Sequence, residues 1–333
     1  MRCVFLLAIL TSLRLPAQDP KPVVAKLDAK KDPDQIGTRD VSKGVNFYSI
    51  EKEMAVGKGL SQQMEKRSTL VQDKLIAEYV NRLAQNLARH SDAKIPITVK
   101  VIEGDDPDAV TIPGGYIYVH TGLLRTADTE AELAAALAHE IAHVAARHGT
   151  RQATQSQIGQ VAAIPLIFLG GGLGTLCMSA AEAAAVPAGT LAIQRGYEME
   201  ADMLGLQYLY KSGYDPLSMV DIFEKIFSIA EQKHPKLLAR LASTHPTGEN
   251  RLVTVQKNIE TLLKARPEYI VNTSEFDNMK VRLLALDWAR KPVPEEPKRP
   301  SLRLPGDQLI ASKKAVPESD VRASQIKEAY TIR

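Results

Sequence analysis

The chain has 333 residues, of which 44% are hydrophobic and 24% charged, and its formal net charge is +3. This composition is typical of a globular protein with a substantial core, and the length allows one large domain or two small ones. The nearly even charge balance excludes the strongly basic character of nucleic-acid-binding proteins, so we expect no nucleic-acid partner.

The N-terminus has the layout of a secretory signal peptide. An apolar run over residues 3–13 follows Met1-Arg2 and precedes a small-residue site, Leu15-Pro16-Ala17. We therefore expect residues 1–17 to be a signal peptide and the mature protein to be exported. An uncleaved N-terminal anchor is the alternative, because an arginine lies in the cleavage region. Cleavage would leave Cys177 as the only thiol, which excludes an internal disulfide.

Two helices are predicted after a polar leader. Residues 18–45 are rich in Lys, Asp and Pro, which predicts a flexible segment. Helical periodicity begins near Tyr48 and continues through Met64. A second helix is predicted from Leu70 to Ala88, because apolar residues recur at helical spacing on one face, namely Leu75, Ile76, Val80, Leu83 and Leu87.

Strand patterns follow these helices. Residues 96–102 alternate as a strand does, and residues 110–112 and 116–119 flank Pro113-Gly114-Gly115, which predicts a tight turn between two strands. A simple hairpin is one interpretation of this turn. The other is an edge strand beside a substrate cleft, to which an extended peptide could add through backbone hydrogen bonds.

The most informative motif is His139-Glu140-Ile141-Ala142-His143, which has the form of a zinc-peptidase signature. A capping box that begins at Thr129 predicts the start of a helix, so the motif lies in the middle of that helix. Residues four apart share a helix face, so His139 and His143 can both bind one ion. Glu140 projects beside that face and is placed to take a proton from an activated water.

Residues 156–195 allow two interpretations. The stretch from Val161 to Ala180 is nearly all apolar or small, so a membrane-spanning helix is one of them. Four glycines and a proline interrupt it, which favours two short helices packed over the active site or touching a membrane face. Peripheral membrane association through residues 156–190 follows from the second interpretation.

The rest of the chain is mainly helical in pattern. One helix is predicted from Gly196 to Lys211, and another from about Leu217 to Leu241. From residue 288 to residue 333 the sequence is rich in Pro, Lys and Arg, which predicts a disordered tail. A single domain over residues 46–287 remains.

Two histidines do not complete a catalytic zinc site, which normally has a third protein ligand. A third histidine ten residues after the first belongs to a familiar pattern with a glycine at position 146, whereas the chain has Ala146 and Gly149. That pattern is therefore excluded. On a continuous helix His148 is rotated about 140° from His143, so we expect it at the surface or behind a ligand.

A carboxylate from another helix is the remaining choice for the third ligand. Glu198 and Asp202 are four residues apart and share a face. If that face meets the His139/His143 helix, Glu198 can bind the ion and Asp202 can fix the tautomer of a ligand histidine. Glu182 is a weaker candidate, because it lies in an alanine-rich run without a supporting carboxylate.

Together these segments resemble the metallopeptidase family that includes the CAAX prenyl endopeptidase, HtpX and the BepA-like periplasmic proteases. The similarity covers residues 48–265 and adds three segments to the two motifs: Pro113-Gly114-Gly115, Gly213-Tyr214-Asp215-Pro216, and Ser243-Thr244-His245-Pro246 with Arg251 downstream. Relatives often have Asn-Ala-Phe where this chain has Asp108-Ala109-Val110, and Ser-Arg where it has Gln194-Arg195.

The resemblance implies a mainly helical α+β fold of the zincin-like metallopeptidase type, with a small sheet whose edge strand borders the active-site cleft. It implies one Zn²⁺ per chain, with Glu198 as the third ligand. It also implies that His245 or Arg251 stabilises the oxyanion of the reaction. His245 has two alternative roles, as a fourth zinc ligand that keeps the enzyme latent or as a loop histidine without function.

The expected function is that of an exported, periplasmic endopeptidase that cleaves unfolded or misassembled envelope proteins. One alternative is a zinc-stabilised envelope chaperone or assembly factor with little turnover, which would keep the same ligands. Another is a membrane-embedded peptidase, which depends on the apolar stretch at 161–180.

Overall fold

The structure is a computed structural model, and it describes residues 28–169, 172–233, 245 and 250–290, without the side chains of 159–191 and 289–290. The chain divides into two compact units, Met1–Trp288 and Ala289–Arg333. The described residues belong almost entirely to the first unit. The predicted signal peptide, the leader up to residue 27 and the tail from residue 291 lie outside them.

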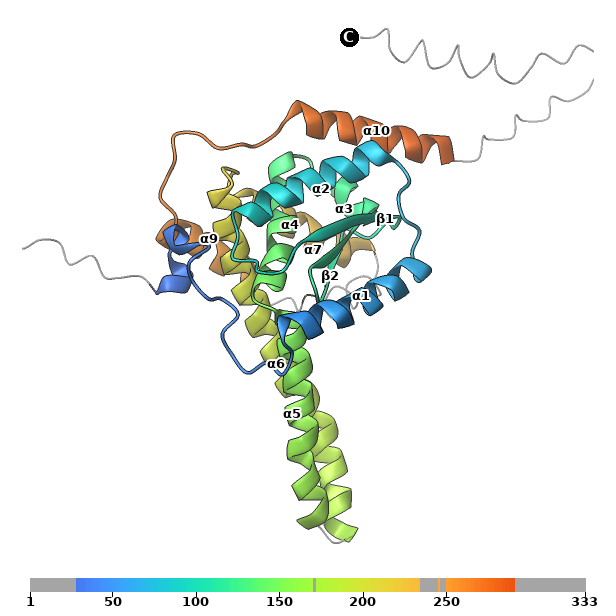
Figure 1. Ribbon diagram of the computed structural model, residues 1–333, viewed down its shortest axis with the longest axis vertical. Coiled ribbons are helices and arrows are strands. Elements are labelled where there is room, and N and C mark those ends of the chain that lie inside the picture. Colours follow the sequence, from blue (N-terminus) through green and yellow to red (C-terminus); the bar gives the residue numbers. More distant parts are fainter. Residues whose placement is uncertain (1–27, 170–171, 234–244, 246–249, 291–333) are drawn as a thin grey trace, which may run out of the picture. The chain divides into compact units, whose positions relative to one another are not determined.

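The helix α4 (Glu130–Ala145) is the centre of the domain, and all of its residues except His143 are buried. The Thr129 hydroxyl accepts a hydrogen bond from the backbone N–H of Glu132 at 3.3 Å, which confirms the predicted helix start. Around α4 pack three helices and one strand, as Figure 1 shows: α2 (Lys74–Arg89), α6 (Gly172–Lys211), α7 (Ser218–Lys233) and β2 (Ala109–Ile112). A helix buried on all sides explains its many alanines, which let neighbouring helices approach closely.

Three short strands form a sheet in the order β1-β3-β2. The central strand β3 (Tyr116–His120) is parallel to β1 (Thr98–Ile102) and antiparallel to β2 (Ala109–Ile112). The turn between β2 and β3 is the predicted one, and Gly114 and Gly115 have φ angles of +85° and +88°, which favour glycine. The strand β2 is therefore an edge strand, and it contacts α4.

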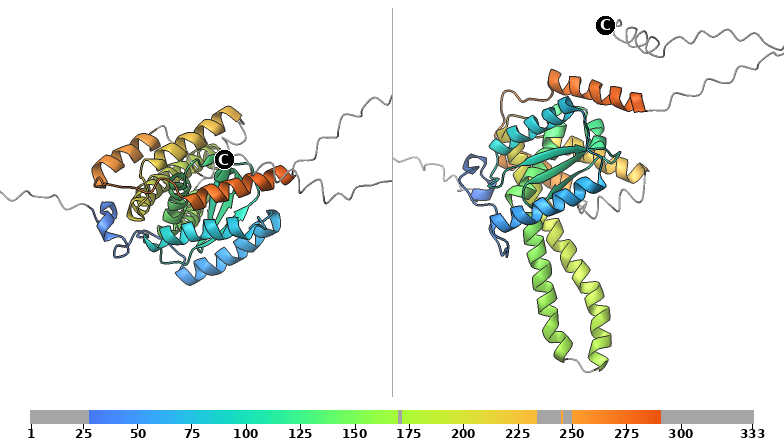
Figure 2. Two further views of the ribbon diagram at one scale, coloured as in Figure 1. Left: turned by 90° about the horizontal axis from the view of Figure 1, so that it is seen from above. Right: turned by 45° about the vertical axis from the view of Figure 1, so that its right-hand side comes forward.

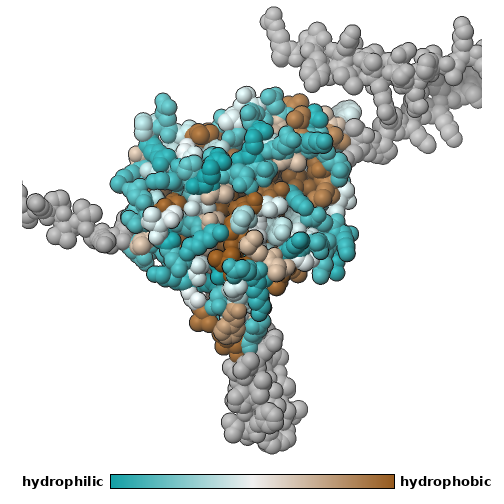
Figure 3. Space-filling view, in the orientation of Figure 1, coloured by the Kyte–Doolittle hydropathy of each residue, from teal (hydrophilic) through white to brown (hydrophobic). Residues whose placement is uncertain are grey.

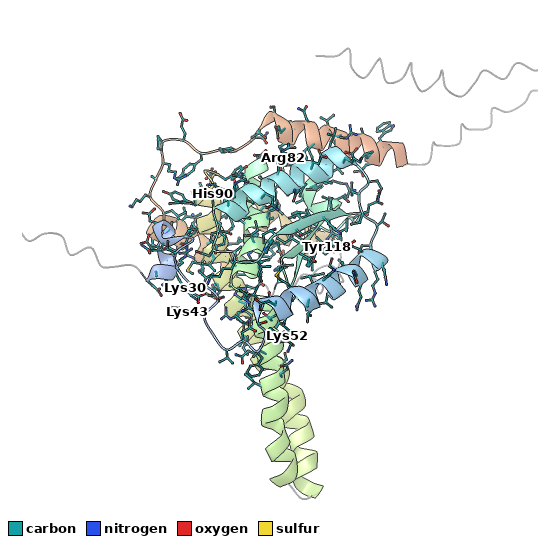
Figure 4. All side chains as sticks on the ribbon, viewed as in Figure 1. Lys30, Lys43, Lys52, Arg82, His90 and Tyr118 are labelled. Carbon is teal, nitrogen blue, oxygen red and sulfur yellow. The ribbon has the colours of Figure 1, made fainter. Side chains whose placement is uncertain are left out.

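Two helices near the N-terminus pack against the sheet. The helix α1 (Ile50–Arg67) contacts β2, and its Ser61 and Glu65 hydrogen-bond the hydroxyl of Tyr118, which Figure 4 labels. The helix α2 (Lys74–Arg89) packs on β1 and α4. It begins four residues later than predicted, because Asp73 caps it and Leu70 instead pairs with Ile102.

The predicted inward face of α2 is partly wrong. Leu75 is 58% exposed, whereas the other four predicted residues are buried. Leu75 lies in the first turn of α2. Elsewhere on the face of the molecule in Figure 3, hydrophilic residues dominate and apolar ones gather near the middle.

The two short helices expected within 156–195 are instead parts of two longer ones. The helix α5 (His148–Leu169) and the first half of α6 (Gly172–Lys211) lie side by side in Figures 1 and 2. The second half of α6 packs on α4 and ends at the predicted residue. In the part of the chain that the structure describes, no helix has both the length and the apolar character that a membrane crossing needs.

Residues 28–45 are not the flexible leader that their composition suggested. They include two short 3-10 helices, η1 (Ala29–Lys31) and η2 (Pro33–Gln35). The buried guanidinium of Arg39 donates to Asp92 at 2.9 Å and to Gln207 of α6 at 2.8 Å. It also donates to three backbone carbonyls of the same segment. A charge buried with this many acceptors anchors the segment to the domain.

Four further helices complete the described part. The short α3 (Thr121–Thr126) follows the sheet, and α7 (Ser218–Lys233) follows the turn after α6. Residues 234–241 of the helix predicted there lie outside the described residues. The helix α9 (Arg251–Leu262) packs on α6 and α7, and α10 (Ser274–Arg290) extends past the predicted domain end at residue 287.

Candidate metal centre and active site

Two histidines of α4 face one point. His139 Nε2 and His143 Nε2 lie 3.1 Å apart, as expected for residues one helical turn apart. Glu140 lies between them in sequence and projects beside this pair. All three side chains are largely buried, so the dense packing around α4 fixes their directions.

The helix α6 brings two carboxylates to the same point. A Cβ atom on Gly205 would lie 2.9 Å from the backbone N and Cα of His139, so the two helices touch there. This approach puts Glu198 Oε1 3.4 Å from His143 Nε2 and Glu198 Oε2 3.5 Å from His139 Nε2. Asp202 Oδ1 lies 2.9 Å from His139 Nδ1, the nitrogen that faces away from the cluster.

His245 supplies a fourth group. Its Nδ1 lies 3.0 Å from Glu198 Oε2 and 3.4 Å from His139 Nε2. Burial lowers the pKa of His245, but Glu198 and Glu140 outweigh that effect and raise the pKa to about 10. The two carboxylates therefore favour a positive charge at the His245 imidazole, which either a bound proton or a bound cation can supply.

These four residues fit a tetrahedral metal ion. The candidate ligand atoms of His139, His143, Glu198 and His245 all lie within 4.8 Å of one another. The five distances given above, which are measured from both carboxylate oxygens of Glu198, run from 3.0 to 3.5 Å. A tetrahedral zinc with bonds of about 2.05 Å has ligand atoms about 3.3 Å apart. The Nε2 atoms of His139 and His143 are 3.1 Å apart. Without a proton or a cation between them, their lone pairs would repel, so this set of donor atoms suits a cation.

Glu140 is held as a base beside this cluster. Its Oε2 accepts a hydrogen bond of 2.6 Å from the hydroxyl of Thr111 on β2, and its Oε1 lies 3.5 Å from His245 Nε2. Burial raises the pKa of Glu140, and the nearby histidines only partly offset that effect. A carboxylate with a raised pKa accepts a proton more readily at neutral pH.

Arg251 contacts the carboxylates rather than the open side of the site. Its Nε and Nη2 donate to the two oxygens of Asp202 at 2.8 and 2.7 Å, and its Nη1 lies 3.1 Å from Glu198 Oε2. All three nitrogens thus face metal-site carboxylates. These contacts favour a positioning role for Arg251 over the predicted role in stabilising the oxyanion.

Two hollows meet at Glu140 and His245. The larger one is lined by the edge strand β2, by Pro113 and Gly114 of the turn, and by His143 and Glu198. Gly115 is the one member of the predicted substrate edge that is not part of this lining. A Cβ atom added at Gly115 would lie 2.1 Å from Pro96 O. Gly115 therefore packs against the segment just before β1 instead. The smaller hollow lies toward α7 and is mainly apolar.

The comparison with protein families agrees with this geometry. Residues 72–259 match the model of peptidase family M48, which is more than half of the chain. The chain belongs to this family.

Relatives of this M48 chain carry names of proteases. It is 30% identical to the beta-barrel assembly-enhancing protease of Yersinia pestis over 82% of this chain and 53% of that protein. Its identity to the protease of the same name in Escherichia coli K12 is 32%, over 72% of this chain and 49% of the other. The mitochondrial metalloendopeptidase OMA1 of Schizosaccharomyces pombe is 29% identical over 54% and 52%. The chain thus spans about half the length of these curated relatives.

His148 takes the second of its two expected places, behind a candidate ligand. It is buried, and its Nδ1 lies 3.0 Å from His143 Nδ1. The helix is not continuous there, because α4 ends at Ala145 and Arg147 has φ +57°, so His148 begins a new helix. His148 Nε2 in turn lies 3.2 Å from Glu200 Oε2.

Two further residues escaped the sequence analysis. In the sequence, Thr111 is one residue of an ordinary strand pattern. Its hydroxyl reaches Glu140 because the edge strand β2 lies next to α4. Glu200 is rotated away from Glu198 on α6, and it meets His148, Lys30 and Arg151. Glu182, the weaker candidate for the third ligand, lies among residues whose side chains are outside the description.

Proposed function

We propose that this chain is an exported zinc-dependent endopeptidase that acts in quality control of envelope or outer-membrane proteins. The observation that supports this most is the cluster of four candidate ligand atoms, within 4.8 Å of one another, beside a buried carboxylate. Membership of peptidase family M48 supports the reaction class. The apolar run before residue 17 supports export, and cleavage there would leave a periplasmic protein.

The residues divide the work of hydrolysis. A zinc ion held by His139, His143 and Glu198 would supply Lewis acidity, which activates water and polarises the scissile carbonyl. Glu140 takes the proton of the attacking water and passes it to the leaving amine. Thr111 holds one carboxylate oxygen of Glu140, so the other stays directed at the reacting groups.

Asp202 and Arg251 keep the ligands in place. Asp202 faces the Nδ1 of His139, which keeps the Nε2 lone pair directed at the ion. Arg251 binds Asp202 through two nitrogens and Glu198 through a third, so it joins both carboxylates of α6. We therefore assign Arg251 to positioning.

We assign His245 to the fourth ligand position that a bound zinc ion would have, where it would keep the enzyme latent until it withdraws. Its Nδ1 is as close to Glu198 and His139 as a tetrahedral ligand would be. A catalytic site needs an open position for water, whereas a site closed by four protein ligands is structural. Withdrawal of His245 would open this position for water.

Unfolded or misassembled envelope proteins are the proposed substrates. Two of the relatives above are named beta-barrel assembly-enhancing proteases. The edge strand β2 lines the larger hollow, so an extended segment of an unfolded protein can pair with its free backbone groups. A folded protein does not offer such a segment.

The variant Glu140→Gln tests the proposed reaction. It keeps the ligands and the shape of the site but removes the base, so it should bind zinc as the wild type does and lose hydrolysis of casein by a factor of about 10² or more. Zinc content would be measured by mass spectrometry, and Thr111→Val would serve as a milder companion. Normal casein hydrolysis by Glu140→Gln would overturn the mechanism.

A zinc-stabilised chaperone or assembly factor is the second candidate, and the contact of His245 with Glu198 favours it. A site closed by four protein ligands would stabilise the fold without turning over substrate. Rescue of an envelope-assembly defect by Glu140→Gln to the wild-type level would select the chaperone. Failure of that variant to rescue, with wild-type rescue intact, would select the peptidase.

A further inference from the structure

The smaller hollow beside Glu140 has an apolar wall. Its described lining includes Leu123 of α3, Ala136 of α4, and Phe223, Ile226 and Phe227 of α7. Its inner end is formed by groups of the metal site, His139, Glu140 and His245. The hollow is therefore continuous with the place where a peptide bond would be cleaved.

The shape of this hollow depends on one small residue. Ala136 precedes Glu140 by four positions, so the two lie on one face of α4. An alanine there leaves open a space that a longer side chain would fill. Across from it, Phe223 packs edge-on against His139, with 5.5 Å between the ring centroids. The ring centroids of Phe223 and Phe227 are 6.3 Å apart.

The wall offers little to a charged group. The nitrogens of Arg251 at its margin are already bound to Asp202 and Glu198. Asp108 also lines the hollow, and with Glu140 it would repel an acidic side chain. Ile226 and Phe227 are half-buried, so they form a rim that a ligand can cover while it excludes water.

We propose that this hollow is a specificity pocket that binds an apolar side chain, of about the size of Leu or Phe, from one of the two residues that flank the cleaved bond. The assignment rests on the proposed peptidase function and adds its substrate preference. Peptides from the core of a misfolded protein expose such residues, and a folded surface presents them rarely.

Cleavage-site profiling tests this pocket. Wild-type protein loaded with zinc would digest a peptide library, and mass spectrometry would give the residues on both sides of each cut. We expect Leu, Ile, Met or Phe to be enriched at one flanking position. Enrichment of Lys or Arg there, which Asp108 could attract, or equal use of all residues would overturn the proposal.

Two variants should move the preference in opposite directions. Ala136→Leu shortens the pocket, so kcat/KM for peptides with Leu or Phe should fall by about 10-fold or more relative to Ala-containing peptides. Phe227→Ala enlarges the pocket and should favour Trp over Leu. Ile229→Ala is the matched control, because Ile229 lies on α7 but does not line the hollow. An unchanged ratio in both pocket variants would contradict the assignment.

A binding measurement separates failure of the pocket from failure of the proposed reaction. Peptide hydroxamates bind zinc without turnover, so they report the pocket even in a protein that cleaves nothing. Isobutyl and benzyl hydroxamates should bind wild type about 10-fold more tightly than the methyl compound, and Ala136→Leu should remove the difference. Equal affinities would overturn the pocket, whereas side-chain discrimination without any cleavage would overturn the peptidase function alone.

Discussion

The carboxylate of Asp202 joins two groups that must keep their directions. One oxygen faces His139 Nδ1 at 2.9 Å, and both oxygens accept from Arg251. Burial raises the pKa of Asp202, but Arg251 and His139 outweigh it and the net pKa is lowered. Asp202 therefore stays ionised in a buried place. Mutation of such partners of metal ligands typically costs about 10- to 100-fold in metal affinity or activity.

His143 also has a carboxylate behind it, but here His148 lies between His143 and the carboxylate, which belongs to Glu200. The Glu200 carboxylate can only accept, so His148 Nε2 donates to it and His148 Nδ1 accepts from His143 Nδ1. His143 then has its free lone pair on Nε2, toward the metal site. Burial lowers the pKa of His148 despite the nearby Glu200. A neutral His148 ring can donate through Nε2 and accept through Nδ1, as this chain of hydrogen bonds requires.

Removing His148 should therefore weaken metal binding. We expect His148→Ala to lower zinc affinity by about 10- to 100-fold, because His143 loses the partner that fixes its tautomer. Competition with a chelating dye measures this in the folded protein. His90→Ala is the control, since His90 caps the end of α2 and its Nδ1 lies 2.9 Å from the backbone oxygen of Asn86. Equal zinc affinities in both variants would contradict the relay.

The latency assigned to His245 leads to a gain of function. His245→Ala keeps three ligands and opens the fourth position, so it should bind zinc and cleave casein faster than wild type, by up to about 10-fold if about one wild-type molecule in ten is open. Initial rates at equal zinc content measure this. A variant that retains zinc but is inactive would instead assign His245 to oxyanion stabilisation.

At the scale of elements, the contact of α4 with α6 builds the site. Gly205 is the residue that allows it, because any side chain there would meet the backbone of His139. His139 and His143 come from α4, and Glu198 and Asp202 come from α6. The spacing of the three ligand atoms of His139, His143 and Glu198 is thus a property of this single crossing.

A substitution at the crossing should separate the two half-sites. We expect Gly205→Ala to destabilise the fold by about 1–3 kcal/mol and to lower zinc affinity with it. Gly196→Ala on the same helix meets nothing within 4 Å, and should be neutral or stabilising by up to about 1 kcal/mol. Urea unfolding and zinc titration compare the two. Equal stability would show that α6 can shift without cost.

Elements with local signals were predictable, and those set by distant partners were not. The capping box at Thr129 and the glycines of the Pro113 turn determine local geometry, so α4 and the hairpin follow from the sequence. Glu198 and Asp202 follow from helical spacing once α6 is assumed to face α4. The end of α4 at Ala145 does not, because the left-handed residue is Arg147 rather than a glycine.

Gly149 shows why such a signal misleads. It follows a histidine and an arginine, as a helix-ending glycine does, yet it lies inside α5. A Cβ there would meet Pro113 Cγ at 2.8 Å, so the glycine serves a close approach to the turn. The sequence shows which residue is small and gives no sign of what lies against it. The packed segment 28–45 was missed for the same reason.

At the scale of the molecule, the buried Arg39 ties the start of the domain to its active-site helix. Arg39→Ala would leave Asp92 buried without its cation, so we expect a loss of about 3–5 kcal/mol of stability and a clear fall in Tm. Arg82→Ala is the control, because its pair with Glu275 is exposed on both sides and is worth about 0.5 kcal/mol. Similar small changes in Tm would contradict the anchoring of residues 28–45.

The same contact has a consequence for the order in which the protein folds. Arg39 and Gln207 are separated by 168 positions in the chain. A polypeptide made or exported from its N-terminus must therefore hold residues 28–45 without their partners on α6 until most of the domain has followed. The loop closed by this contact contains all of α4 and the metal-binding part of α6, and long-range closure is slow. This early segment is thus among the last to be fastened to α6, and until then its groups that bind α6 remain open to other binding partners.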